Sequence, residues 1–258
     1  MRWHLLFLVV LLAGGPALAC SVPPSDMPER ADSWRDPEAG AVWRVEMIGR
    51  TGRYAHGIMG DLADSEGLMV TVSGISPKPC PALISLPVSR VIEDIAPRLA
   101  DVTGDGRPEV VTVVASRTGG ARLAIFDLAL EPVAFGPEIG RRFRWLGIAG
   151  IGDFDGDGKP DIAYVETPHL GKTLRIWTLR AGDLVELAQR PGLTNHRIGE
   201  DFMSSAVRRC PPGDQVVLAN DDWSRIIAAR VAGGAIVAED LGPFNGRDSL
   251  EIAAAACP

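Results

Sequence analysis

Four aspartates within nine residues are the part of this sequence whose spacing most clearly suits chemistry. The stretch from Gly152 to Asp161 reads GDFDGDGKPD, which places carboxylates at positions 1, 3, 5 and 9 of a loop that begins at Asp153. Calcium takes six to eight oxygen ligands, and its loops present carboxylates at alternate positions around a glycine turn. Here Gly158 supplies that turn. We therefore predict a Ca²⁺ site formed by Asp153, Asp155, Asp157, the Lys159 carbonyl and Asp161.

The predicted site differs from an EF-hand in its flanks and in its last position. Position 12 is Tyr164 where an EF-hand carries a bidentate glutamate, and β-branched runs flank the loop in place of helices. Four carboxylates this close repel one another without a cation, and a divalent ion reverses that cost. The alternative is a solvated acidic turn that holds no metal.

A second loop repeats the pattern with fewer charges. From residue 100 the sequence reads ADVTGDGRPEVVTV, and one aspartate is replaced by a hydroxyl, so weaker calcium binding is expected. The ligands would be Asp101, Thr103, Asp105, the Arg107 carbonyl and Glu109. Two degraded copies, GDLADSEGLMVTV from Gly60 and SAVRRCPPGDQVVL from Ser205, lack the ligands and are not expected to bind.

These copies recur along the chain at the period of a propeller blade. Equating Asp61, Asp101, Asp153 and Ala206 gives spacings of 40, 52 and 53 residues, and a period of about 40–50 residues with several short strands per unit is typical of β-propellers. In the third unit the expected strands are 145–151, 161–166, 173–179 and 184–188; the second and fourth units span 95–135 and 201–240. The sequence thus predicts an all-β fold, a small β-propeller of four to five four-stranded blades. A fifth, closing blade would take strands from both termini, residues 43–47 and 249–256.

GDFDGDGKPD between two strands, repeated at this period, resembles the FG-GAP/VCBS repeats of integrin-alpha-like β-propellers. The resemblance covers roughly residues 54–240. It implies calcium in the loop between the first and second strands of a blade, and a role in adhesion or ligand binding. Asp153, Asp155, Asp157 and Asp161 match the family loop, as do Asp101, Asp105 and Glu109. The sequence departs from the family in lacking a literal Phe-Gly…Gly-Ala-Pro element, and it is too short for the blades of an integrin propeller.

The N-terminal residues indicate export. Residues 1–19 have a short basic start, an apolar run and a small-x-small cleavage pattern, as a signal peptide does. Residues 20–42, rich in Pro, Ser and Asp, are predicted to be a flexible tether, and 43–258 the propeller domain. Cleavage would leave a periplasmic or secreted protein; lipidation of Cys20 is the alternative and would make an outer-membrane lipoprotein.

Charge and cysteine content bound the partners. A net charge of −7 argues against nucleic acid, and no later segment reaches the roughly 20 apolar residues of a membrane span. In an oxidising compartment an even number of cysteines favours two disulfides, whose pairing the sequence leaves open. The cysteines are Cys20, Cys80, Cys210 and Cys257.

Residues that lead into first strands would gather at one mouth of the central channel. His196, Glu200, Arg144 and His56 are the candidates for ligand binding there. A His with carboxylates nearby could work as acid and base, but no nucleophile elbow, phosphate loop, dinucleotide fingerprint or zinc motif is present. The first hypothesis is therefore a binding module for a protein or glycan, with structural calcium. The alternative is a propeller hydrolase or lyase acting on an extracellular polymer.

Overall fold

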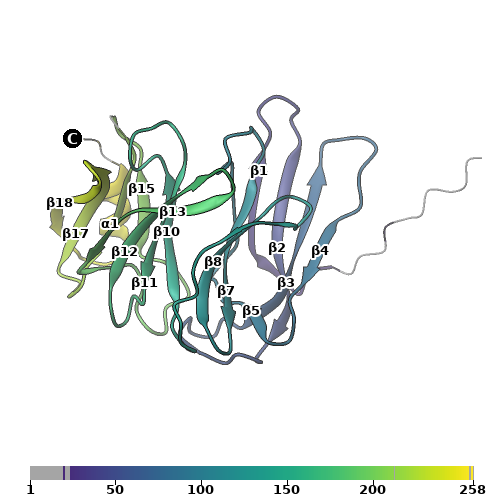
Figure 1. The fold of residues 1–258 in the computed structure, drawn as a ribbon, viewed down its shortest axis with the longest axis horizontal. Helices are drawn as coiled ribbons and strands as arrows, with labels where there is room; N and C mark the ends of the chain where they lie inside the picture. The colour runs from purple at the N-terminus through teal and green to yellow at the C-terminus, as the bar shows by residue number, and fades with distance from the viewer. Residues whose placement is uncertain (1–19, 21–23, 212, 256, 258) are drawn as a thin grey trace, which may run out of the picture.

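The computed structural model describes residues 20, 24–211, 213–255 and 257, and these residues are largely strands (Figure 1). The predicted signal peptide, residues 1–19, lies outside the described residues. The described chain contains eighteen strands and one helix, so the predicted all-β fold is confirmed. Among the described residues no helix is both long and apolar enough to cross a membrane.

Four antiparallel units of four strands follow one another along the chain, as predicted for consecutive propeller blades (Figure 1). The first unit comprises β1 (Met27–Arg35), β2 (Val42–Thr51), β3 (Asp64–Ser73) and β4 (Ala82–Ser85). The second comprises β6 (Arg98–Ala100), β7 (Glu109–Ser116), β8 (Gly120–Phe126) and β9 (Pro132–Phe135). The third comprises β10 (Leu146–Gly152), β11 (Asp161–Glu166), β12 (Thr173–Arg180) and β13 (Asp183–Pro191). The fourth comprises β15 (Ser205–Arg208), β16 (Gln215–Asn220), β17 (Arg225–Ala232) and β18 (Ala235–Pro243).

Two short strands extend these units. β5 (Arg90–Ile92) pairs with both β3 and β7, and so joins the first two units into one nine-stranded sheet. β14 (Leu193–Thr194) pairs with β16 in the fourth unit. β5 precedes β6, and β14 precedes β15. The segment that separates each pair, residues 93–97 and residues 195–204, leaves the sheet and shapes the site described below.

The second strand of each central unit is apolar on both faces because it lies between two cores. In β7, Val110 and Val114 belong to the core shared with the first unit, whereas Val111 and Val113 belong to the core shared with the third. β11 alternates in the same way between the cores toward the second and fourth units. A strand buried on both faces has a continuous apolar sequence, which is why these runs stood out in the sequence.

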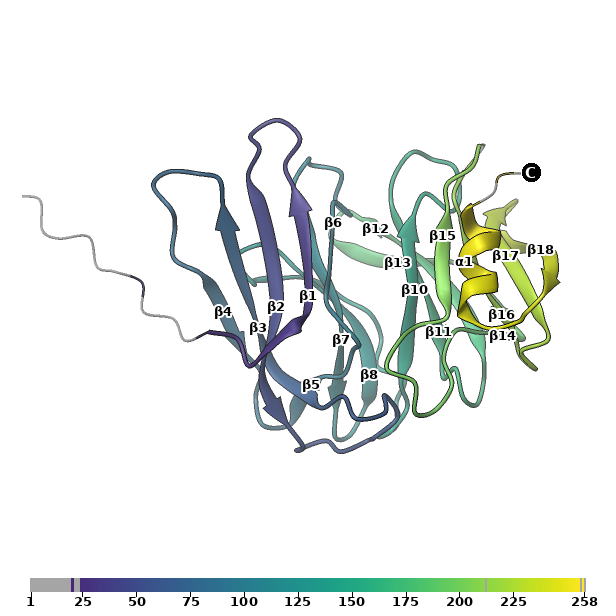
Figure 2. The same ribbon diagram turned by 180° about the vertical axis from the view of Figure 1, so that it is seen from behind.

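The expected fifth blade, built from both termini, is not formed. Residues 43–47 lie within β2, and residues 247–255 form the helix α1 (Arg247–Ala255). A helix forms because this segment is rich in alanine, the residue with the highest helix propensity. Leu250, only 1% exposed, packs with Val217 and Ile226 of the fourth unit, so α1 covers the face that a further blade would cover. The first unit and α1 lie at opposite ends of the molecule in both views (Figures 1 and 2).

The predicted flexible tether is also wrong, because residues 27–35 form β1 and pair with β2. Met27 is fully buried in the core between the first two units. The guanidinium of Arg30 donates to the backbone carbonyls of Ile95, Ala63 and Asp94. Hydrogen bonds of polar side chains thus hold this strand in position. Because its sequence lacks the alternation of apolar residues that predicts a strand, it resembles a linker.

The degraded copy at Asp61 does not occupy the place predicted for it. Asp61 lies between β2 and β3, the second and third strands of its unit, whereas Asp101 and Asp153 lie between first and second strands. This β2–β3 loop crosses to the fourth unit, where the Gly199 amide donates to the Ile58 carbonyl over 2.9 Å. A Cβ at Gly60 would lie 2.7 Å from the Gly199 carbonyl oxygen, so this approach requires glycine.

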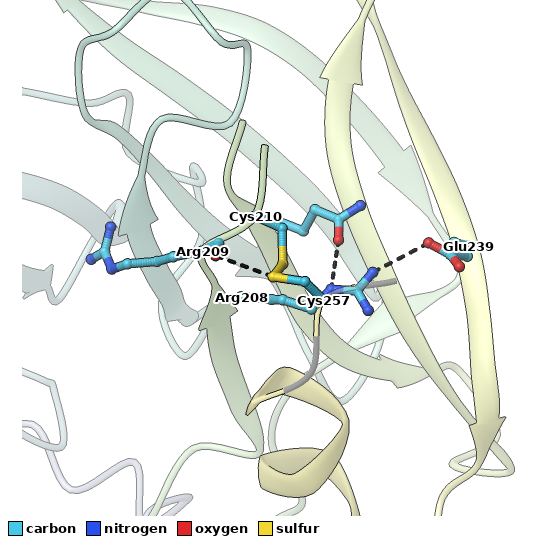
Figure 3. Close-up of a disulfide and its surroundings, with 6 residues drawn as sticks. Arg208, Arg209, Cys210, Glu239 and Cys257 are labelled. Carbon is cyan, nitrogen blue, oxygen red and sulfur yellow. Dashed lines mark hydrogen bonds and ion pairs between the residues drawn. A yellow bond between two sulfur atoms is a disulfide. The ribbon is translucent and has the colours of Figure 1, made fainter. Parts of the chain in front are cut away.

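Both pairs of cysteines form disulfides. Cys20 bonds to Cys80, and Cys210 bonds to Cys257. Cys210 follows β15 and Cys257 follows α1, so the second bond fastens the C-terminal helix to the fourth unit (Figure 3). Beside it, the buried Arg208 donates to the Glu239 carboxylate over 3.2 Å (Figure 3).

Candidate functional site

The Asp153 loop is a tight turn between β10 and β11, whose ends meet through the pairing of Gly152 with Asp161. Asp153 shapes the turn: its Oδ1 accepts the Gly156 amide over 2.8 Å and its Oδ2 accepts the Gly158 amide over 3.0 Å. Gly158 has a φ of +87°, so the glycine predicted at the turn does adopt a conformation that disfavours other residues.

Three of the four predicted carboxylates meet in this loop. One oxygen from each of Asp153, Asp155 and Asp161 lies within 4.8 Å of the others. Asp161 is fully buried; its Oδ2 accepts the Phe154 amide over 3.0 Å, and its Oδ1 has no hydrogen-bond partner. Burial, together with the charge of Asp155, raises the pKa of Asp161 to about 7, against the lowering effect of interactions with the Thr178 side chain and the Phe154 and Asp155 amides. The loop therefore holds an unsatisfied buried carboxylate oxygen beside two further carboxylates.

The fourth predicted carboxylate of this loop is not part of the group of three. Asp157 is exposed and outside the group of three, and its Oδ1 accepts the Lys159 amide over 2.9 Å. Lys159 is exposed as well and lines a depression of about 400 Å³ together with Asp153, Arg209 and Asp214.

The Asp101 loop has a similar turn, but its carboxylates are satisfied by the chain. Asp101 accepts the amides of Gly104, Asp105 and Gly106. Glu109, the counterpart of Asp161, accepts the Val102 and Thr103 amides and the Thr103 hydroxyl. The Arg107 amide donates to Asp105. Among the described residues, the acids of this loop do not form a group with converging oxygens.

Asp214, the acid that remains in the fourth copy, connects the Asp153 loop to the next unit. Its amide donates to the Asp153 carbonyl over 2.8 Å, and its Oδ2 accepts the Asp153 amide over 3.1 Å. The same oxygen accepts from Arg209 over 2.8 Å. A ligand that fixes the Asp153 loop would therefore also affect the contact between the third and fourth units.

A second cluster lies at the other end of β10, where the predicted channel-mouth residues were expected. Trp145 precedes β10, and its indole Nε1 donates to the Glu93 carbonyl over 2.7 Å. His56, from the β2–β3 loop, has its Nδ1 2.6 Å from Oε1 of Glu93. Glu93 is fully buried and its Oε2 has no hydrogen-bond partner. The first three units thus contribute to one His–Glu pair beside a tryptophan.

Burial shifts both members of this pair toward their neutral forms. It raises the pKa of Glu93 well above its usual range, with help from Asp64 and Asp94. Burial and the charge of Arg144 lower the pKa of His56 to about 4. The 2.6 Å between the nitrogen and the oxygen is a hydrogen bond, and both pKa shifts favour the uncharged forms of the two groups.

The fourth unit and the β11–β12 turn add a pair of imidazoles. His169 Nε2 lies 2.8 Å from His196 Nδ1, and His196 Nε2 donates to the Glu200 carbonyl over 3.0 Å. This chain of bonds leaves Nδ1 of His169 without a proton. Burial lowers the pKa of both rings, that of His169 to about 4. The Trp145 ring stacks on His169 and meets His196 edge-on.

His196 and Glu200, two of the predicted ligand-binding residues, do not meet through the Glu200 carboxylate. Glu200 contacts His196 through its backbone carbonyl, and its carboxylate accepts the Arg197 amide. The acid that does meet a histidine is Glu93, which sequence reasoning missed. Its signal was present, because Glu93 and Asp94 interrupt an apolar run. Two acids within such a run indicate that the strand ends there and that the buried acids have polar partners.

These residues surround a pocket of about 320 Å³. His56, Phe143, Arg144, Trp145, His169 and Ile198 are among its lining residues. Its walls include strained backbone, since Phe143 and Thr167 have φ values of +59° and +47°. Strain of this kind concentrates at functional sites. Of the predicted mouth residues, His56 and Arg144 line the pocket, while His196 lies behind His169.

Comparison with known proteins gives a family for part of the chain. Residues 101–164 match the FG-GAP-like repeat, so the predicted resemblance is confirmed for the segment that contains both acidic loops. No curated protein matches the chain.

Two solved structures are similar in outline. One is the exotype rhamnogalacturonan lyase YesX, with a TM-score of 0.49 and 11% identity over 84% of this chain and 49% of that one. The other is the rhamnogalacturonan lyase YesW, with a TM-score of 0.44 and 12% identity over 84% of this chain and 50% of that one. The chain spans about half the length of these structures.

Proposed function

We propose that this protein is an exported β-propeller module stabilised by a calcium ion, which Asp153, Asp155 and Asp161 hold between β10 and β11. The observation that carries the proposal is the buried Oδ1 of Asp161, which has no hydrogen-bond partner and lies with the oxygens of two other carboxylates. A buried polar atom without a partner destabilises the fold. A divalent cation would satisfy this oxygen and offset the repulsion among the three carboxylates.

Calcium, as a hard cation, suits this loop better than zinc or copper does. The donors are carboxylate oxygens, which hard cations prefer, and the described residues of the loop offer no sulfur or imidazole. Asp157 and the Lys159 carbonyl remain predicted ligands, since either would add the further oxygens that calcium requires. The Asp101 loop would bind more weakly, because backbone amides already satisfy its acids.

The role of the ion would be structural. It would fix the turn between two strands and, through the hydrogen bonds of Asp214, the contact with the fourth unit. The cluster of His56, Glu93 and Trp145 lies at the far end of β10 from the Asp153 loop. β10 covers six residue steps, which is roughly 20 Å at about 3.3 Å per residue. An ion in the Asp153 loop therefore supports the propeller without touching that pocket.

The two disulfides support export, because disulfides persist in oxidising compartments. With calcium in a structural role, the module would bind a protein or a glycan. A hydrolase or lyase acting on an extracellular polymer is the second candidate. The His56–Glu93 pair beside a pocket favours it, since a His hydrogen-bonded to a carboxyl group can exchange a proton with a substrate.

Calorimetric titration of calcium into the chelator-treated protein, from Cys20 onward, tests the proposal. We expect one site with a stoichiometry near one, lost in Asp155→Asn and kept in Asp105→Asn. Asp105 is the matched control because it lies in the equivalent turn and is likewise bonded to a backbone amide. Absence of binding to the wild type, or equal loss in both variants, would contradict calcium binding by the Asp153 loop.

A further inference from the structure

The pocket beside the His56–Glu93 pair has a rim of exposed apolar side chains. Ile198 is 69% exposed and Leu170 is 64% exposed, and both line this pocket. Ile58 and Phe143 continue the apolar wall inward, and Phe143 stacks on the His56 ring at 4.9 Å between centroids. Large apolar side chains exposed around a concavity mark a surface that another molecule covers.

Inside this rim lies one cation without an acidic partner. Arg144 lines the pocket and is half-buried, and no carboxylate pairs with it among the described residues. Among the described residues, the guanidinium makes one hydrogen bond, a long one of 3.5 Å to the Phe143 carbonyl. A guanidinium offers five donors in a planar fork, so most of this capacity is free for a ligand.

The neighbouring titratable groups do not neutralise Arg144. Burial favours the uncharged forms of both His56 and Glu93, and His169 is neutral near pH 7 because burial lowers its pKa to about 4. Asp64 and Asp94 lie behind Glu93, toward Arg30, and do not line this pocket. The pocket therefore has a positive interior, although the protein as a whole carries a net charge of −7.

Two imidazoles lie beside the cation. His169 presents Nδ1 without a proton, because its Nε2 donates to His196, so this nitrogen can accept a hydrogen bond but cannot donate one to an anion. His56 is held by Glu93 through Nδ1, which leaves Nε2 as its remaining polar atom. An anchored imidazole and a free guanidinium around an apolar wall fit an anion attached to an apolar body.

We propose that this pocket binds a carboxylate ligand with an apolar body: the carboxylate is held by Arg144, and the body is covered by Phe143, Leu170 and Ile198. Two sources share this chemistry, a free organic acid and the C-terminus of a peptide that ends in an apolar residue. The proposal is independent of calcium, because the metal loop lies at the other end of β10.

Binding of matched acids and amides to the full chain from Cys20 onward tests the proposal. The first pair of probes is phenylacetate and phenylacetamide; the second is N-acetyl-alanyl-phenylalanine and its C-terminal amide. Ligands of about ten non-hydrogen atoms bind in the millimolar range, so NMR-detected titrations should extend to about 20 mM. We expect each acid to bind at least about fivefold more tightly than its amide, as a charge-assisted bond to arginine requires. The tighter pair identifies the source.

Two variants assign the effect to the pocket. Arg144→Gln should abolish the preference for the acid, whereas Arg141→Gln should keep it, because Arg141 is exposed in the same loop and does not line the pocket. Ile198→Ser should weaken acid and amide equally, since it removes apolar contact only. Equal affinity of the wild type for acid and amide, or no binding of either acid, would overturn the proposal. These comparisons in the wild type hold even if a variant fails to fold.

Discussion

Replacing Asp161 by asparagine should have opposite effects on the metal-free and the calcium-loaded protein. In the metal-free fold, burial and the charge of Asp155 raise the pKa of Asp161 to about 7, against 3.8 for an ordinary aspartate. Between these values the folded chain holds a proton that the unfolded chain has released, so stability falls as the pH rises. From pH 5 to above pH 7 the loss amounts to roughly 3 kcal/mol, at 1.36 kcal/mol per pKa unit over about two units.

Asparagine removes this dependence because it does not titrate. The side-chain amide nitrogen of asparagine would take the position of Oδ1 of Asp161, which has no partner. This nitrogen can donate to a neighbouring carboxylate. In chelator, Asp161→Asn should therefore gain roughly 3 kcal/mol relative to the wild type between pH 5 and pH 8. In excess calcium the order reverses, since the ion stabilises only the folded chain that binds it.

Urea unfolding of the wild type and of Asp161→Asn at pH 5 and pH 8, with chelator and with calcium, measures the free energies of unfolding that this comparison needs. Differences between variant and wild type cancel the contributions of other raised carboxyls, such as Glu93 and Asp64. Glu109→Gln is the matched control in the other loop, where hydrogen bonds already satisfy both oxygens, and it should leave the main calcium response intact. A difference between wild type and Asp161→Asn that is constant with pH in chelator, or a variant that calcium still stabilises, would refute the reasoning.

Three further predictions concern the connections between units and the chain ends. Asp214→Ala, which removes the acceptor of the Asp153 amide, should lower the free energy of unfolding in urea by about 1–3 kcal/mol; an unchanged value would mean that this link does not hold the units together. Cys257→Ser opens the bond to Cys210, across a sequence separation of 47 residues, and should cost about 4 kcal/mol from chain entropy. In that variant, reducing agent should have a smaller effect on thermal unfolding than in the wild type. The Cys20 sulfur is used in a disulfide, so intact-mass measurement of the exported chain should show no lipid on that residue, and a diacylglycerol adduct would contradict the pairing.

The sequence was most informative where a strand is buried on both faces. The predicted strand 161–166 coincides with β11, because the apolar side chains of this strand fill two cores at once. Elements held by other forces were missed: β1 depends on hydrogen bonds of Arg30 to distant carbonyls. The predicted terminal strand is the helix α1, because its alanines favour a helix and its leucine packs into the core of the fourth unit.

For the site, the sequence predicted contacts between residues that are close in the chain and missed contacts between residues that are far apart in it. Three carboxylates of the Asp153 loop converge as expected, since the turn and its acids lie within nine residues. The His56–Glu93 pair joins residues 37 positions apart, and no motif announces it. It arises because the β2–β3 loop reaches Gly199 of the fourth unit, which only the fold reveals.

Calcium binding by the Asp153 loop can be seen in a crystal structure of the chain grown with calcium, by recording anomalous scattering at a wavelength where calcium contributes. We expect an anomalous peak in the β10–β11 turn, with oxygens of Asp153, Asp155 and Asp161 at about 2.3–2.6 Å from it. A turn whose three carboxylates contact only water, while Asp161 keeps its proton, would contradict it.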